Sequence, residues 1–287
     1  MISDILTLMC AAGHVATTRQ LRARFSARHL TRACDAGLIK RLTRGLYSCA
    51  HVDAQLVIAA QAGGRLDCVS ALFRHEVWSG VDRPALHLRM EPHQHVRRST
   101  PGAFVHWSDT VRSGSLLEVA PVDAVLQAIR CLSPDDALAC VESALHTGYL
   151  SDDELDLVML HAPARLHPVL AGIDRGAQSG YETLVRLKLA RAGLRVRTQA
   201  YVLGAGHVDI LVEDCVGLEI DGERWHGPER FVHDRTKDRN AELQGIRMLR
   251  IARPHIFEDW NATIAAIRRM VNDAQRGQRS QRRRSGS

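Results

Sequence analysis

The chain has 287 residues, of which 45% are apolar and 5% aromatic, enough for a sizeable core in about two domains. The formal net charge is +6, but five of these charges are arginines after Asp273, so +1 is left for the rest of the chain. No apolar run approaches the roughly 18 residues of a membrane span, and the start "MISDILTLMCAAG" lacks the basic region of a signal peptide.

Seven cysteines stand at positions 10, 34, 49, 68, 131, 140 and 215, with no CxxC pair and no zinc-binding spacing. Such an odd, scattered set predicts free thiols, mostly buried, in a reducing compartment. Together with the lack of a membrane span and of a signal peptide, this predicts a cytoplasmic protein with no membrane partner. The arginine-rich end, residues 273–287, predicts a solvated and disordered tail that could strengthen non-specific contact with phosphates.

Residues 1–50 predict three short helices and then two strands, which is the order of a winged helix. Thr17 or Thr18 stands where the second helix begins, and Ser26 where the third begins. Basic side chains fall on the third helix and on the wing: Arg28, His29, Arg32, Lys40, Arg41 and Arg44. A helix in the major groove and a wing on backbone phosphates would use such a surface, which predicts DNA binding. The alternative is a winged helix that contacts proteins, with its arginines merely solvated.

Residues 51–170 predict an α/β connecting module. "ALHLRM" and "AFVHWS" alternate as strands, "DCVSALFRHEVW" contains a helix capped by Ser70, and three further helices are expected in "VDAVLQAIRCL", "PDDALACVESALHTG" and "SDDELDLVML". Ser151 and Glu154 form a capping box for the last of these helices. Four histidines cross the two strands and the turn between them: His87, His93, His95 and His106. We interpret "EPHQHVRRSTPG" as a polar turn, with a metal site as the alternative.

Residues 179–272 predict the clearest domain, in the order αβββαβα. Ser179 caps the helix "GYETLVRLKLARAG", and three strands follow in "LRVRTQAYV", "HVDILVED" and "VGLEIDG". The helix "FVHDRTKDRNAELQG", the strand "IRMLRIA" and the helix "HIFEDWNATIAAIRRMV" complete the order. An antiparallel meander with one crossover gives a central sheet flanked by helices, so the whole chain is expected to be a multi-domain α/β protein.

Three carboxylates interrupt the apolar strands of this domain. Glu219 and Asp221 share one face of their strand, and a hairpin would place Asp209 opposite their neighbourhood. Carboxylates gathered in this way raise one another's pKa unless a cation lies among them. Because hard oxygen ligands suit Mg²⁺ or Mn²⁺, the pattern predicts a divalent-metal site for phosphodiester hydrolysis.

Further residues around these strands could assist. Glu182 on the preceding helix could reach the metal, His226 could act as general base, and Arg235 or Lys237 could bind a phosphate. Asp238 could orient His226 or pair with an arginine. Two alternatives remain open: a decayed site, or a structural ion-pair network in which arginines neutralise the acids (Arg224, Arg235, Arg239 and Arg250).

The stretch "HVDILVEDCVGLEIDGERWH…DRTKDRNAELQGIRMLRI" resembles the very-short-patch-repair-like (Vsr-like) endonucleases of the PD-(D/E)xK restriction-endonuclease-like superfamily, over residues 179–272. The resemblance implies that Asp209 and Glu219 are the paired metal-binding acids and that Glu182 is the acid on the helix. The catalytic lysine of the superfamily would fall at position 221, where this chain has Asp221.

Residues 1–165 resemble, less specifically, the AbiEi antitoxins of abortive-infection type IV toxin–antitoxin systems, through "GHVATTRQLRARFSARHLTRACDAGLIKRLTRGLYSC". This resemblance implies DNA binding by the first 50 residues and adds a cognate toxin or defence-system protein as a partner class. Together the two resemblances suggest a DNA-binding, Mg²⁺-dependent endonuclease (a deoxyribonuclease). The alternative is an antitoxin-like transcriptional regulator whose nuclease-like domain is inactive.

Overall fold

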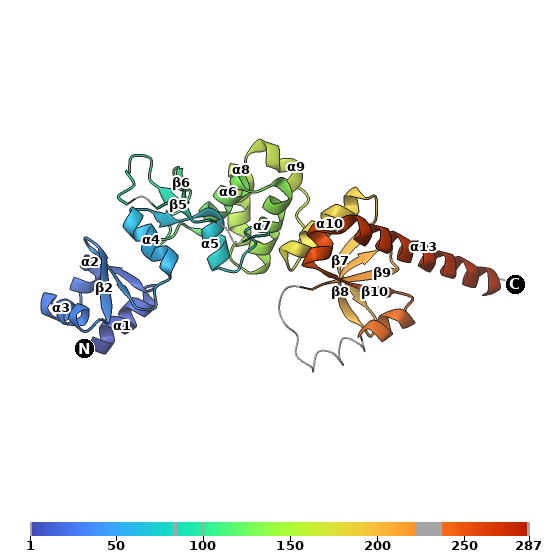
Figure 1. Ribbon diagram of the computed structural model, residues 1–287, viewed down its shortest axis with the longest axis horizontal. Helices are drawn as coiled ribbons and strands as arrows, with labels where there is room; N and C mark the ends of the chain where they lie inside the picture. Colours follow the sequence, from blue (N-terminus) through green and yellow to red (C-terminus); the bar gives the residue numbers. More distant parts are fainter. Residues whose placement is uncertain (1, 83–84, 99, 222–236, 286–287) are drawn as a thin grey trace. The chain divides into compact units, whose positions relative to one another are not determined.

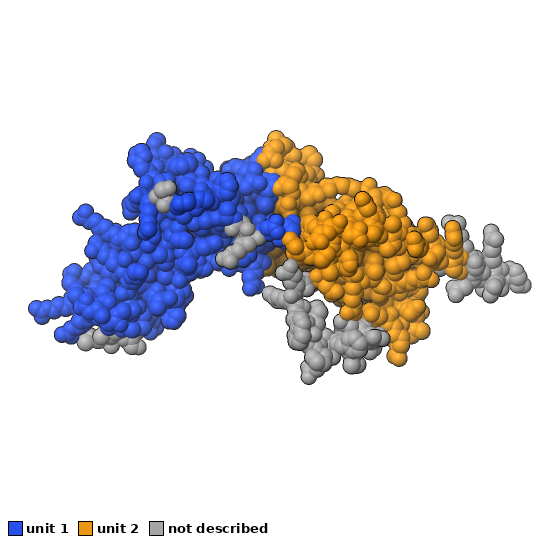
Figure 2. Space-filling view, in the orientation of Figure 1, with its two compact units in different colours: residues 1–132, 149–163 blue, residues 133–148, 164–287 orange. Residues whose placement is uncertain are grey.

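The computed structural model describes residues 2–82, 85–98, 100–221 and 237–285 (Figure 1). Among these residues the chain is mixed α/β with three separate small sheets, in agreement with the predicted α/β class. It forms two compact units, one of residues 1–132 and 149–163, the other of residues 133–148 and 164–287 (Figure 2). None of the described helices is long and apolar enough to cross a bilayer.

The first segment of unit 1 contains three helices around a small antiparallel sheet of order β1-β3-β2. Its elements are α1 (Ile2–Ala11), β1 (Val15–Thr17), α2 (Thr18–Arg22), α3 (Ala27–Asp35), β2 (Ile39–Thr43) and β3 (Leu46–Cys49). Thr17 caps α2 in a reciprocal box with Gln20, and Ser26 accepts a hydrogen bond from the backbone of His29 at the start of α3. The three helices and the hairpin match the sequence prediction, to which the structure adds β1.

The rest of unit 1 packs helices against a second sheet, in which β5 lies between antiparallel β4 and parallel β6. Its elements are α4 (Ala54–Ala62), β4 (Arg65–Leu66), α5 (Cys68–Arg74), β5 (His87–Met90), β6 (Phe104–Trp107), α6 (Pro121–Cys131) and α8 (Asp152–His161). The prediction that Ser70 caps α5 is wrong, because the helix begins two residues earlier. The Ser70 hydroxyl instead accepts the His87 N–H at 2.8 Å and donates to the Ala85 carbonyl, which ties α5 to β5.

Unit 2 is built on a four-stranded sheet of order β10-β9-β8-β7, in which only β10 and β9 are parallel. Its elements are α7 (Pro134–His146), η1 (Ala164–Leu166), α9 (His167–Leu170), α10 (Gly180–Arg191), β7 (Val196–Val202), β8 (Gly206–Val212), β9 (Val216–Asp221), β10 (Arg247–Ala252), α12 (Arg253–Phe257) and α13 (Trp260–Ser285). Residues 237–243 are also helical. The meander followed by a parallel strand agrees with the sequence prediction.

Apolar side chains on both faces of this sheet hold unit 2 together. On one face, Val185 of α10 and Ile267 of α13 pack against Ile210 and Leu218. On the other face, Ala241 of the helical segment 237–243 packs with strand residues of β7 and β8. The sheet is therefore a middle layer with helices on both faces, and Figure 1 shows α10 and α13 together on one of these faces.

The C-terminal region differs from the prediction in two respects. The single closing helix is divided into α12 and α13, since residues 258–259 leave the helical conformation. Residues 273–285, expected to be a disordered tail, continue α13. The reason is that Ile267, Val271 and Ala274 anchor the helix on the core, and elongation from an established helix costs far less than nucleation.

Candidate functional site

Three of the predicted acids, Glu182, Asp209 and Glu219, lie near one another where the pairing of β8 with its neighbours is interrupted. The β8–β9 ladder ends at the pair Ile210 and Leu218, and the ladder to β7 omits Asp209. The Asp209 carboxylate then accepts the backbone N–H of Ile220 at 2.8 Å, a bond that takes the place of a strand-to-strand contact. Asp209 is thus fixed at the opening between β8 and β9, close to where the hairpin argument expected it.

Gln199 links Asp209 to Glu182. Its side-chain amide donates to Glu182 at 3.1 Å and to Asp209 at 3.3 Å. Gln199 has φ of 46°, a left-handed conformation that residues other than glycine seldom adopt and that surrounding structure must enforce. Sequence reasoning missed Gln199, since nothing in an alternating strand signals a residue with positive φ.

Glu182 is the most buried of the three acids. Its carboxylate accepts hydrogen bonds from the Ser179 hydroxyl at 2.9 Å and from the Gln178 N–H at 3.1 Å. Burial raises the pKa of Glu182 above the usual range, and the nearby Asp209 charge raises it further. Because Glu182 is buried and close to the Asp209 carboxylate, binding of a cation between the two would stabilise their ionised forms.

Glu219 has a cation beside it already. The Lys237 ammonium lies 2.8 Å from Glu219 and also donates to the His207 carbonyl. Burial raises the pKa of the Glu219 carboxyl, and the hydrogen bond from Lys237 acts in the opposite direction. Lys237 was predicted to bind a phosphate; the structure places it at the carboxylate site itself.

The chemistry of these side chains suits a hard divalent cation, although the geometry is not closed around one. Within the described residues, the Lys237 ammonium contacts Glu219, whereas Glu182 and Asp209 accept hydrogen bonds from neutral groups, the Gln199 amide and the Ile220 N–H. The charge of Arg250 also acts on Glu219, in the direction of a lower pKa. The three carboxylates do not form a group whose ligand atoms all lie within 4.8 Å of one another in that part of the chain. For Mg²⁺ or Mn²⁺ to bind, either the Gln199 amide would have to release Glu182 or Asp209, or Lys237 would have to release Glu219.

The remaining predicted residues of this site divide into two sets. Asp221 ends β9 in register with Ala252, and its carboxylate has no hydrogen bond or ion pair within the described residues. Asp238 lies 3.6 Å from Arg250, which is the arginine pairing expected for it as an alternative. His226 and Arg235 lie outside the described residues, as does Arg224.

The predicted DNA-contacting residues lie on α3 and on the β2–β3 hairpin. Five are exposed, namely Arg28, Arg32, Lys40, Arg41 and Arg44, and His29 is half-buried against the Ser26 hydroxyl. None of the six pairs with a carboxylate in the described part of the chain. Three more exposed arginines lie on α2 and just after its C-terminal end: Arg19, Arg22 and Arg24. Sequence reasoning did not single these out, although "TRQLRAR" carries them at helical spacing.

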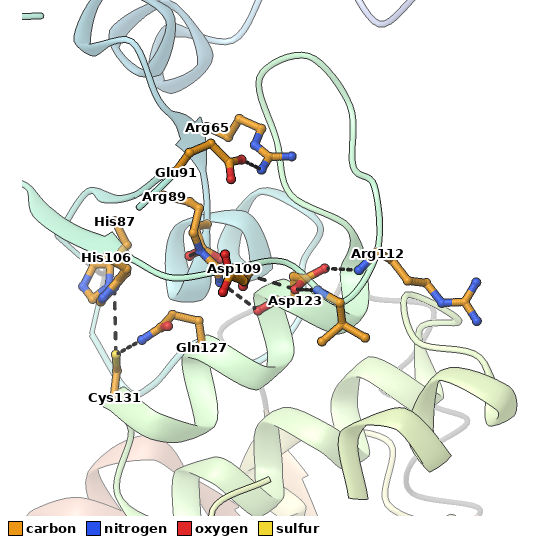
Figure 3. Close-up of polar contacts among 12 residues, drawn as sticks. Arg65, His87, Arg89, Glu91, His106, Asp109, Arg112, Asp123, Gln127 and Cys131 are labelled. Carbon is orange, nitrogen blue, oxygen red and sulfur yellow. Dashed lines mark hydrogen bonds and ion pairs between the residues drawn. The ribbon is translucent and has the colours of Figure 1, made fainter. Parts of the chain in front are cut away.

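Unit 1 also contains polar clusters that sequence reasoning found only in part. Of the four histidines considered as an alternative metal site, His87 and His106 belong to one of these clusters, together with cysteines, and His93 and His95 do not. Arg89 is buried in β5, with its Nε 2.7 Å from Asp67, and its guanidinium donates to the Asp109 carbonyl beside Asp123 (Figure 3). Two groups of cysteine and histidine bring four ligand atoms within 4.8 Å of one another: Cys10, His14, Cys49 and His51, and Cys68, His87, His106 and Cys131. The spacing of the cysteines in the sequence did not indicate these groups, because the two cysteines of each group lie far apart in the sequence and are brought together by the fold.

Fold and sites together describe a multi-domain α/β protein with a carboxylate cluster on one unit and a basic surface on the other. No family model and no curated protein matches the chain. A solved structure, the RV2827C protein from Mycobacterium tuberculosis, is similar at 14% identity over 64% of this chain and 80% of that chain, with a TM-score of 0.29. A similarity of this degree carries no argument about fold or function.

Proposed function

We propose that the chain is a DNA-binding, divalent-metal-dependent endonuclease, with a restriction-endonuclease-like domain in unit 2 and a winged helix in residues 1–50. The observation that supports the nuclease site most is the position of Asp209. It lies at the opening of the β8–β9 ladder, where Glu182, Glu219 and Lys237 also converge. Acids placed at a strand opening, with an ammonium group beside them, suit binding of both a metal ion and a phosphate.

Asp209 and Glu219 would hold Mg²⁺ or Mn²⁺, with Glu182 as a third acid. Such an ion supplies an activated water and stabilises the charge on the scissile phosphate. Lys237 would leave Glu219 to contact a phosphate oxygen once a metal neutralises that carboxylate. It would also provide the ammonium group that position 221 lacks, since that position holds Asp221. The roles proposed for His226 as general base and Arg235 as phosphate ligand concern residues outside the described part.

The test is cleavage of supercoiled plasmid with Mg²⁺ or Mn²⁺ by the full chain and by the Asp209→Asn/Glu219→Gln variant. We expect nicking by the wild type and a reduction of about 100-fold or more in the variant, because changes to groups around metal ligands alone cost 10–100-fold. The matched control is Glu242→Gln/Asp273→Asn, two exposed acids of the same unit, which should cut like the wild type. Equal nicking by all three proteins would refute the site.

A second candidate function is favoured by the contacts that already satisfy the carboxylates. Lys237 compensates Glu219, and Gln199 donates to both other acids, so the cluster is a self-consistent network without metal. In this alternative the chain is an antitoxin-like transcriptional regulator, with DNA and a cognate toxin or defence-system protein as partners. It predicts DNA binding that does not change when divalent metal is removed, measured by fluorescence anisotropy with and without EDTA.

A further inference from the structure

We infer that Cys68, His87, His106 and Cys131 bind Zn²⁺ in a structural site of unit 1, separate from the carboxylates of unit 2. The four side chains come from four elements: the first residue of α5, the first residue of β5, the middle of β6 and the last residue of α6. Two thiols and two imidazoles are the ligand set that Zn²⁺ takes in closed tetrahedral sites. This inference does not depend on the proposed nuclease activity.

The fold brings these side chains together through strand register and helix ends. In the parallel β5–β6 pair, His87 stands opposite Phe104 and Arg89 opposite His106, so the two histidines are diagonal neighbours on one face. Figure 3 shows both rings turned toward Cys131 at the end of α6, with Gln127 beside its sulfur. Cys68 is fully buried, and φ of 56° places it in the left-handed region, a conformation that costs energy and concentrates at functional sites.

The separations agree with tetrahedral coordination. Zn–N bonds of about 2.0–2.1 Å and Zn–S bonds of about 2.3 Å give ligand–ligand edges of roughly 3.3–3.8 Å. The His87 Nδ1 to His106 Nε2 distance is 2.9 Å, and the His106 Nε2 to Cys131 Sγ distance is 4.0 Å. These values bracket the expected edges, and all four ligand atoms lie within 4.8 Å of one another. Small side-chain adjustments would therefore suffice to close the shell.

A closed shell of four protein ligands leaves no position for substrate, so the ion would be structural. It would join the start of α5 and the end of α6 to the β4-β5-β6 sheet. The buried Arg89 of β5 also pairs with Asp67, directly before α5. The zinc site would therefore hold the middle part of unit 1 together.

The geometry points independently to a second Zn²⁺ site, at Cys10, His14, Cys49 and His51. Here the ligands occur as two close pairs in sequence, one at the end of α1 and in the turn after it, the other at the end of β3. The Cys49 sulfur lies 3.3 Å from His14 Nδ1 and 4.0 Å from His51 Nδ1. His14 has φ of 70°, and its carbonyl accepts the Cys49 N–H at 3.1 Å. An ion there would fasten the small first segment, whose own core is limited.

The test is the metal content of the full chain after zinc reconstitution under reducing conditions and removal of loosely bound metal. We expect about two zinc ions per chain in the wild type. Cys68→Ser/Cys131→Ser and Cys10→Ser/Cys49→Ser should each retain about one. Cys34→Ser, a thiol outside both groups, is the control and should keep both ions.

A second measurement uses the wild type alone and therefore does not depend on whether the variants fold. Titration of the metal-free chain with Co²⁺ should produce the intense visible absorption of tetrahedral cobalt together with thiolate-to-cobalt charge-transfer bands, and zinc should displace both. A folded wild type that keeps no zinc and shows only the weak spectrum of octahedral cobalt overturns both sites. Loss of all zinc in the Cys10→Ser/Cys49→Ser variant, with its fold retained, overturns the site at Cys68. A Cys68–Cys131 disulfide that forms despite excess zinc overturns it as well.

Discussion

Arg89 shows how strongly a single buried residue can constrain unit 1. Its side chain is only 2% exposed, 2.7 Å from Asp67 and 4.0 Å from Asp123. The carboxylate of Asp123 in turn accepts the backbone N–H groups of Val111 and Arg112. Burial raises the pKa of Asp67, with Arg89 acting in the opposite direction. The network links β5 to α6 and to the segment after β6, so removing its cation would leave buried carboxylates uncompensated.

Replacement of Arg89 by Met should therefore lower the free energy of unfolding of unit 1 by about 3–5 kcal/mol. The matched control is Arg65→Met, which breaks the more exposed ion pair with Glu91 and should cost about 0–1 kcal/mol. Urea denaturation monitored by tryptophan fluorescence would compare the two variants with the wild type. Similar losses of stability in both variants would contradict the prediction that removing Arg89 leaves buried carboxylates uncompensated.

At the scale of elements, two helices start with similar caps but in different surroundings. Ser179 caps α10 and donates to Glu182, the acid of the candidate site. Ser151 caps α8 with Glu154 in the same way, but in unit 1. The two serines therefore separate the effect of a lost helix cap from the effect on the site.

Both Ser179→Ala and Ser151→Ala should destabilise their unit by about 1 kcal/mol, the usual effect of losing a helix cap. Only Ser179→Ala should weaken Mn²⁺ binding, by about 10-fold, because Glu182 loses the hydroxyl that orients it. Calorimetric Mn²⁺ titration beside urea denaturation measures the two effects. Equal Mn²⁺ affinity in the two variants would argue that Glu182 is not a ligand.

Most helices and strands could be predicted because their signals are local. Ser26, Ser151 and Ser179 mark helix starts, and the alternation in "HVDILVED" and "VGLEIDG" marks paired strands. Asp209 and Glu219 could be predicted to lie near one another for the same reason, since strand parity and one hairpin fix their neighbourhood. Glu182 lies on a helix, and the sequence predicted only that it could reach the same place.

What could not be predicted depends on register and on contacts between distant elements. The Cys68 group needs the parallel β5–β6 register and the end of α6, neither of which the sequence states. Lys237 reaches Glu219 only because the segment 237–243 packs over one particular face of the sheet. The positive φ of Gln199 is imposed by its surroundings rather than by its residue type.

At the scale of the whole molecule, the basic surface on α3 and the β2–β3 hairpin predicts binding that depends steeply on salt. Arg28→Ala/Arg32→Ala should weaken binding of a DNA duplex and reduce the slope of log K against log salt by about 2, if each arginine contacts one phosphate. Arg98→Ala/Arg112→Ala, two exposed arginines elsewhere in unit 1, should leave the slope unchanged. Fluorescence anisotropy over a salt series measures this, and identical slopes in all three proteins would count against a DNA-binding surface there.

The chain passes from one unit to the other at 132/133, 148/149 and 163/164. As a result α7 precedes α8 in sequence but belongs to unit 2, where Glu142 accepts the Arg186 guanidinium, the Thr183 hydroxyl and the Asp174 N–H. A fragment that begins at residue 164 would lack Glu142, so these three donors would lose their acceptor. The side of α10 that packs against α7 would become exposed to solvent. Neither unit is a single continuous stretch of the sequence. A fragment designed to fold as unit 2 must therefore include residues 133–148 as well as the sheet.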